Sequence, residues 1–140
     1  MRPVDLDLVV MKIEHLAYQI QDPVAAADWY VKNLGMSVKR AQPERPFGQF
    51  LADGAGTVML EFYNHPKVEV PDYRRIDPLI LHIAFSVDDV AETRRALLSA
   101  GATAEGEVTV TDVGDHLAML RDPWGLPVQL VHRRSPMIPS

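Results

Sequence analysis

The 140-residue chain contains no cysteine, which excludes disulfide bonds, thiolate catalysis and cysteine-based zinc sites. Basic residues never cluster beyond a pair and the formal net charge is -5 at pH 7, so we expect no nucleic-acid partner. Acidic and basic side chains interrupt the apolar stretch of the first twenty residues, which neither a secretory signal nor a membrane span would tolerate. These absences predict a cytoplasmic protein without a membrane partner.

What the chain does contain is an internal repeat. The segment EHLAYQIQDPVAAADWYVKNLGMSVKR, residues 14–40, aligns with LHIAFSVDDVAETRRALLSAGATAEGE, residues 81–107, so that His15 falls on His82. Each copy opens with apolar residues at every second position, which predicts a strand. The chain therefore contains two structural units of the same kind.

Each predicted strand leads into a helix with recognisable ends. The helix starts are predicted at Asp22, which Pro23 follows, and at Asp88 or Asp89 in the second copy. Glycine residues, Gly35 and Gly101, predict where the two helices stop.

Three short apolar runs, separated by turn residues, follow each helix and predict three further strands per copy. The sequence therefore predicts an α+β fold with two tandem βαβββ modules in a single domain, residues 1–140. Module one covers about residues 11–64, a proline-containing linker about 65–79, and module two about 80–132. We expect the residues before the repeat to add an edge strand.

Four polar residues occupy matching places in the two modules. Glu61 follows His15 by 46 residues, and Gln129 follows His82 by 47. Because strand side chains alternate between faces, all four can point to the same face of their sheets, away from the helices, which the neighbouring apolar residues would contact. The residues expected to face the helices are Leu16, Leu60, Phe62, Ile83, Val128 and Leu130.

Glu61 stands in the apolar run VMLEFY, where an ionised carboxylate is costly unless a cation or hydrogen-bond donors compensate it. With His15, His82 and Gln129 it forms a nitrogen and oxygen ligand set suited to Zn, Ni, Co, Mn or Fe. The alternative is that the histidines are hydrogen-bonded core residues and that Gln129 bonds the backbone or a neighbouring ligand.

Four further residues are candidates for substrate binding. Tyr63 shares the alternation of Glu61, and His116 begins a predicted strand. Arg74 and Arg75 lie in the linker, where they could bind an anionic substrate. The alternative for all four is an ordinary strand or surface residue.

Taken together, these motifs resemble those of the vicinal oxygen chelate superfamily, which contains glyoxalase I, bleomycin resistance proteins and extradiol dioxygenases. The resemblance lies in EHLAYQIQDPVAAADWYVKNLGM, LHIAFSVDDV and RDPWGLPVQLV, and it covers nearly the whole chain. It implies paired βαβββ modules whose curved mixed sheets enclose a metal-binding cleft, commonly completed in a homodimer.

Within that superfamily the pattern is nearest to bacterial glyoxalase I. The resemblance places His15, Glu61 and His82 on three of that enzyme's four metal ligands, and Gln129 where the enzyme has a catalytic glutamate. It therefore implies that Glu61 alone serves as the catalytic base. Gln19 and His65 replace the arginine and asparagine that recognise glutathione there, which disfavours glutathione as substrate.

Three functions follow from these observations. The first is a metal-dependent glyoxalase-like lyase or isomerase that binds a small oxygenated substrate on a divalent cation. The second is an Fe(II) extradiol-type dioxygenase that uses His15, His82 and Glu61 and keeps open metal positions for substrate and O2. The third is a metal-free protein that sequesters a ligand, as bleomycin resistance proteins do.

Overall fold

The computed structural model describes residues 10–138. Contacts between residues divide the chain into two compact units that separate between Val70 and Pro71, and each unit is described by itself. No helix within residues 10–138 is both long and apolar enough to cross a membrane. The edge strand expected before the repeat falls largely on residues 1–9, outside the described residues, and residues 10–14 form no strand.

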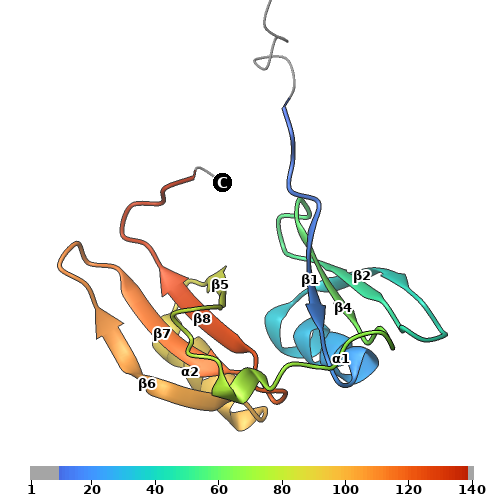
Figure 1. Cartoon of the computed structure of the whole chain (residues 1–140). Coiled ribbons are helices and arrows are strands. Elements are labelled where there is room, and N and C mark those ends of the chain that lie inside the picture. Colours follow the sequence, from blue (N-terminus) through green and yellow to red (C-terminus); the bar gives the residue numbers. More distant parts are fainter. Residues whose placement is uncertain (1–9, 139–140) are drawn as a thin grey trace, which may run out of the picture. The chain divides into compact units, whose positions relative to one another are not determined.

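The first unit is a four-stranded mixed sheet with one helix on it (Figure 1). Its strands are ordered β1-β4-β3-β2, with β1 parallel to β4 and the other neighbours antiparallel. The helix packs mainly on β3 and β4, the sheet's two central strands. The elements are β1 His15–Gln19, α1 Pro23–Leu34, β2 Ser37–Ala41, β3 Gln49–Ala52 and β4 Met59–Tyr63.

The second unit repeats this architecture. Its strands are ordered β5-β8-β7-β6, again with one parallel pair, β5 and β8, and α2 packs on β6, β7 and β8. The elements are the short 3-10 helix η2 Tyr73–Arg75, β5 Ile83–Ser86, α2 Val90–Ser99, β6 Thr103–Val110, β7 His116–Arg121 and β8 Pro127–His132. Two four-stranded mixed sheets with one helix each confirm the predicted α+β fold of two βαβββ modules.

Both helices begin at the kind of residue that the sequence predicted. Asp22 caps α1, because its Oδ1 accepts a hydrogen bond from the backbone N–H of Ala25 at 3.1 Å, and Pro23 is the first helical residue. Of the two candidates in the second module, Asp89 is the cap, since its Oδ1 accepts from the N–H of Glu92 at 3.0 Å.

The helix ends differ slightly between the modules. Gly35 follows α1 directly and has φ +67°, the left-handed conformation that glycine adopts without strain. In the second module, α2 ends at Ser99 and is capped by Ala100, and Gly101 follows with φ +108°. Gly101 thus serves the turn after the helix rather than the cap itself.

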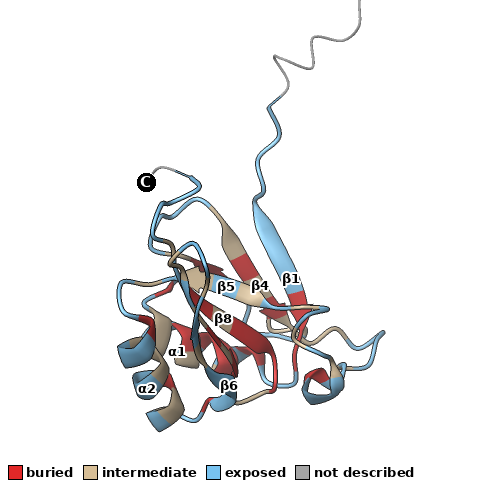
Figure 2. Ribbon diagram, turned by 90° about the vertical axis from the view of Figure 1, so that its left-hand side faces the viewer, coloured by how far each residue is buried: buried red, intermediate tan, exposed pale blue. Residues whose placement is uncertain are grey.

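The apolar core lies between each helix and its sheet. Leu60, Phe62, Val128 and Leu130 are buried there, as the alternation predicted. Leu16 is 45% exposed, so its predicted burial is wrong. The reason is its position on an edge strand: the first half of β1 is exposed and only its second half is covered (Figure 2).

Candidate functional site

The first pair of candidate ligands, His15 and Glu61, lies on the two parallel strands of the first unit. Ala17 of β1 is directly opposite Glu61 of β4. His15 is two residues before Ala17 and therefore shares the face of Glu61. The Nε2 atom of His15 lies 3.6 Å from Oε1 of Glu61. The register of one parallel strand pair thus brings together two residues that are far apart in sequence.

The second pair, His82 and Gln129, has the same register in the second unit. Ala84 of β5 is opposite Gln129 of β8, and His82 precedes Ala84 by two residues. His82 lies one residue before the start of β5, so the chain there is close to the strand but not part of it. The near-equal sequence spacings therefore correspond to one structural rule used twice.

The histidine of each pair is held through its Nδ1 atom. In His15, Nδ1 lies 2.9 Å from Oε1 of Glu14, and in His82 it lies 2.7 Å from the backbone oxygen of Pro78. Both partners are oxygen acceptors, so a neutral imidazole donates its Nδ1–H to them and carries its lone pair on Nε2. An outer oxygen that fixes the ring in this way is the usual support of a metal-ligating histidine.

The environment of Glu61 is less enclosed than its apolar run predicted. Its side chain is 19% exposed, and that of His15 is 37% exposed. Phe50 of β3 is directly opposite Glu61, and its ring meets the His15 imidazole edge-on, with 5.5 Å between centroids. The carboxylate is thus partly buried, with an imidazole on one side and an aromatic ring on the other.

The donor atoms present fit a divalent cation. Two ligands at about 2.1 Å from a metal, and about 90–110° apart, are separated by about 3.0–3.4 Å, close to the separation in the first pair. Within residues 10–138 no three His, Cys, Asp or Glu side chains gather as a metal-binding group. Each unit by itself supplies one of the two pairs.

Tyr63 and Gln19 occupy the same face as the first pair. They are opposite each other at the ends of β4 and β1. Tyr63 is half-buried, and its place two residues after Glu61 keeps it available as a substrate contact. Its role stays a prediction.

The other three substrate-binding candidates lie in the second unit. Arg74 donates from Nη2 to the backbone oxygen of Pro123 at 2.5 Å, and the exposed Arg75 pairs with Asp72 at 3.6 Å. His116 is the exposed first residue of β7. The first two are thus engaged within their own unit, and a role in substrate binding stays a prediction for all three.

The sequence did not predict what Gln19 does. Gln19 is buried, with only 7% of the residue exposed, and its side-chain amide holds the loop that follows β4. Nε2 donates to the backbone oxygens of His65 at 2.8 Å and Val68 at 2.9 Å, while Oε1 accepts from the N–H of His65 at 2.8 Å. A polar residue at the end of β1, on the face that carries His15 and Glu61, was the available signal.

Arg121 is a second residue that sequence reasoning missed. Its side chain is buried at the end of β7 and forms an ion pair with Glu105 at 2.5 Å. The guanidinium also donates to the backbone oxygens of Tyr73, Ile76 and Gly125, at 2.7, 3.0 and 3.2 Å. It therefore fastens the segment around η2 to the second sheet.

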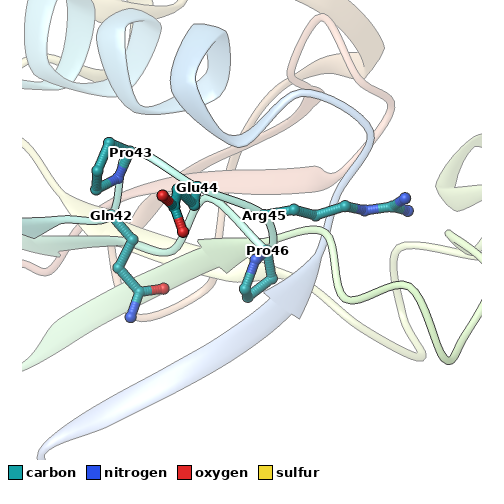
Figure 3. Close-up of a pocket in the computed structure, with 5 residues that line it drawn as sticks. All are labelled: Gln42, Pro43, Glu44, Arg45 and Pro46. Carbon is teal, nitrogen blue, oxygen red and sulfur yellow. The ribbon is translucent and has the colours of Figure 1, made fainter.

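A cavity of about 260 Å³ lies within the loop between β2 and β3, lined by residues 42–46 (Figure 3). Gln42 accepts a hydrogen bond from the N–H of Gly48 at 3.2 Å, and Arg45 donates to the backbone oxygen of Asn64 at 3.3 Å. Arg45 points away from the Gln42 and Glu44 side chains (Figure 3). Two of the polar side chains around this cavity are thus hydrogen-bonded to nearby backbone, and none is among the candidate ligands.

Comparison with known proteins supports the fold and its class. A curated relative, a probable lactoylglutathione lyase of Vibrio parahaemolyticus, is 25% identical over 130 residues, which are 88% of this chain and 91% of that protein. The crystal structure of TnmS3, an antibiotic binding protein from Streptomyces sp. CB03234, superposes with a TM-score of 0.69 at 21% identity, over 90% of this chain and 98% of that one.

A glyoxalase/bleomycin resistance protein/dioxygenase family enzyme from Burkholderia phytofirmans PsJN gives a TM-score of 0.71 at 19% identity, over 87% of this chain and 98% of that one. The family model of the Glyoxalase/Bleomycin resistance protein/Dioxygenase superfamily matches residues 12–130. That range covers all but the last two residues of the eight strands and two helices, and it includes all four candidate ligands. The chain belongs to the glyoxalase/bleomycin resistance protein/dioxygenase superfamily.

Proposed function

We propose that the chain is a metal-dependent, glyoxalase-like enzyme of the lyase or isomerase type. In this proposal His15, Glu61, His82 and Gln129 hold one divalent cation, on which a small oxygenated substrate binds. The observation that carries the proposal is the repeated pair: in each module a histidine held through Nδ1 stands two residues before the strand residue that lies opposite an oxygen-bearing side chain, in the same parallel register. A protein that only sequesters a ligand has no need of this arrangement.

When bound, the cation supplies Lewis-acid stabilisation of negative charge that develops on a substrate oxygen. The histidines present Nε2, because Glu14 and the Pro78 carbonyl accept their Nδ1–H groups. Glu61 is the one carboxylate of the set, so it is the residue able to accept a proton from a substrate carbon. We therefore propose Glu61 as both ligand and base.

Gln129 limits the kind of reaction that the proposed site can catalyse. Its amide oxygen is a competent metal ligand, but an amide does not accept a proton near neutral pH. A reaction with one proton abstraction is therefore compatible with the site, whereas a reaction that needs two carboxylates on opposite faces of the substrate is not.

The similarity to a probable lactoylglutathione lyase of Vibrio parahaemolyticus supports a lyase-type reaction. The proposal does not extend to glutathione as the substrate. Gln19 and His65 are hydrogen-bonded to each other through the Gln19 amide and the His65 backbone, and this consumes the Gln19 donor that would face a substrate. We also propose that the protein acts in the cytoplasm and as a homodimer.

Metal analysis tests the proposal. Wild-type protein, stripped and then dialysed against Zn, Ni, Co, Mn or Fe, is expected to retain one cation per complete ligand set, and Glu61→Ala is expected to lose it. Loss in Gln129→Ala as well would establish the fourth ligand. Glu44→Ala, an exposed acid on the β2–β3 loop, is the control and is expected to retain the metal.

Three outcomes decide against the proposal. If wild-type protein retains no stoichiometric metal, the chain is a binding protein, as TnmS3 is described to be. If the protein takes up Fe and consumes O2 with a panel of catechols, it is a dioxygenase instead. Retention of metal in both Glu61→Ala and Gln129→Ala would show that the centre lies elsewhere.

A further inference from the structure

A cavity of about 240 Å³ adjoins the first pair within the first unit. It lies on the sheet face that carries His15 and Glu61, because Phe50 and Met59, which also line it, share that face by register. Its lining residues are Glu14, His15, Lys39, Arg40, Phe50 and Met59. The cavity therefore adjoins the candidate site through His15. Its lining residues come from all four strands of the sheet, together with Glu14 directly before β1.

Two consecutive cationic residues, Lys39 and Arg40, both line this cavity. In a regular strand, neighbouring side chains point to opposite faces, so only one of the two would point to the face that carries the cavity. The register between β2 and β3 shifts here: Val38 is opposite Leu51 and Arg40 is opposite Phe50, which leaves Lys39 as an extra residue. A β-bulge of this kind redirects side chains, and it brings both cations to the same cavity.

The positive charges of these two residues are not neutralised by an ion pair within residues 10–138. Lys39 and Arg40 are exposed, and neither forms an ion pair with any residue between 10 and 138. The acid that lines the cavity, Glu14, is held against Nδ1 of His15 at 2.9 Å. The cavity is therefore lined by two cations without an ion-pair partner and by one carboxylate, which leaves a net positive charge for a ligand.

Phe50 lies between the cations and the first pair. The Arg40 guanidinium carbon is 6.0 Å from the centre of the Phe50 ring, and that ring is 5.5 Å from the His15 imidazole. Glu61, Phe50 and Arg40 stand opposite one another on three adjacent strands, β4, β3 and β2. With a strand spacing of about 4.8 Å, the backbones that carry the acid and the arginine are about 10 Å apart.

We infer that this cavity binds the anionic end of the substrate, a carboxylate or phosphate group on a flat apolar body that lies against Phe50. The inference rests on the proposed function, because the opposite end of the same molecule would reach His15 and Glu61. Arg40 supplies a planar fork of donors that matches either anion, and Lys39 adds a point charge. An aromatic ring contributes apolar contact area for the body between the two ends.

Binding of simple organic anions to metal-free protein tests the inference. Benzoate and phenyl phosphate are titrated into chelator-treated full-length protein and followed by 1H–15N NMR, with benzamide as the uncharged analogue of benzoate. Amide shifts are expected at Lys39, Arg40 and Phe50. The double variant Lys39→Gln/Arg40→Gln is expected to weaken benzoate binding by about tenfold or more, since it removes both charge-assisted contacts.

The matched control is Lys67→Gln/Arg95→Gln, which removes the same charge from exposed positions that do not line the cavity. The dissociation constant of this control for benzoate is expected to stay within about twofold of the wild-type value. A change of that size is too small to represent a lost ionic contact. The inference is overturned if neither anion shifts these amides in wild-type protein, if benzamide binds as tightly as benzoate, or if the cavity double variant binds like wild type.

The outcome is separable from that of the proposed function. Lys39→Gln/Arg40→Gln is expected to retain metal as wild type does, because neither residue belongs to the ligand set. A wild-type protein that binds benzoate in this cavity but retains no metal refutes the proposed enzyme and leaves the anion site in place. A protein that retains metal but binds neither anion refutes the anion site alone.

Discussion

Replacing Gln19 with leucine tests the claim that one buried amide holds the loop after β4. Leucine fills a similar volume but provides no donor or acceptor, so the change removes hydrogen bonds without opening a large cavity. Three of these bonds are short, at 2.8, 2.9 and 2.8 Å, and a fourth, to Oδ1 of Asn64, is 3.4 Å. All of them belong to a residue that is only 7% exposed.

The expected magnitude follows from the three short bonds. Each neutral hydrogen bond contributes about 1 kcal/mol net, so Gln19→Leu is expected to lower the free energy of unfolding by about 2–3 kcal/mol. The expected loss is smaller than the cost of leaving the same donors and acceptors unpaired in a fully buried site, because the loop's backbone is partly open to water and can be rehydrated. Urea unfolding followed by circular dichroism measures the loss.

Hydrogen exchange gives a second, local measurement. The backbone N–H of His65 donates to Oε1 of Gln19, so its exchange is expected to accelerate in Gln19→Leu while the amides of β3 change little. Gln21→Leu, at an exposed position two residues further on, is the control and is expected to change stability by less than about 0.5 kcal/mol. A loss below about 0.5 kcal/mol in Gln19→Leu, or unchanged exchange at His65, would refute the reasoning.

Two further predictions concern the second unit. Arg121→Met is expected to destabilise the protein by about 3–5 kcal/mol in urea unfolding, because it leaves Glu105 without its partner and three carbonyls without a donor; a loss below about 1 kcal/mol would contradict it. The backbone N–H of Arg134, followed by the Arg133 side chain, holds the pKa of Asp115 below its usual value of 3.8. Its stabilisation is therefore full above about pH 4 and is lost as the pH falls through the lowered pKa, so Asp115→Asn is expected to lose less stability than wild type between about pH 5 and pH 2. Equal losses in the two proteins would contradict that role.

The predicted architecture succeeded where the signals were local. Strand alternation, an Asp placed to cap a helix and a glycine that stops one each depend on a few adjacent residues, and Asp22 and Gly35 have the roles predicted for them. Leu16 shows the limit of such signals. Its place in the alternation is that of a core residue, but it is 45% exposed because it lies on the uncovered half of an edge strand.

The candidate site also has features that the sequence predicted and features that only the folded structure reveals. The spacing of His15 to Glu61 and of His82 to Gln129 predicts two pairs. The structure brings the first pair to 3.6 Å and places Ala84, two residues after His82, opposite Gln129. The sequence did not indicate that Lys39 and Arg40 share a face. A bulge depends on how β2 pairs with β3, and a strict alternation assigns consecutive residues to opposite sides.

By itself, the sequence determined that the chain is built twice from one plan and that His15 and Glu61 can share a sheet face, because both follow from periodicity along the chain. The tertiary structure alone decided which histidine nitrogen is presented, since Glu14 and the Pro78 carbonyl had to be placed beside the rings. It also decided that Gln19 serves the loop after β4 rather than the open face of the sheet. Such roles depend on partners brought close by folding, and no pattern of neighbours in the sequence encodes them.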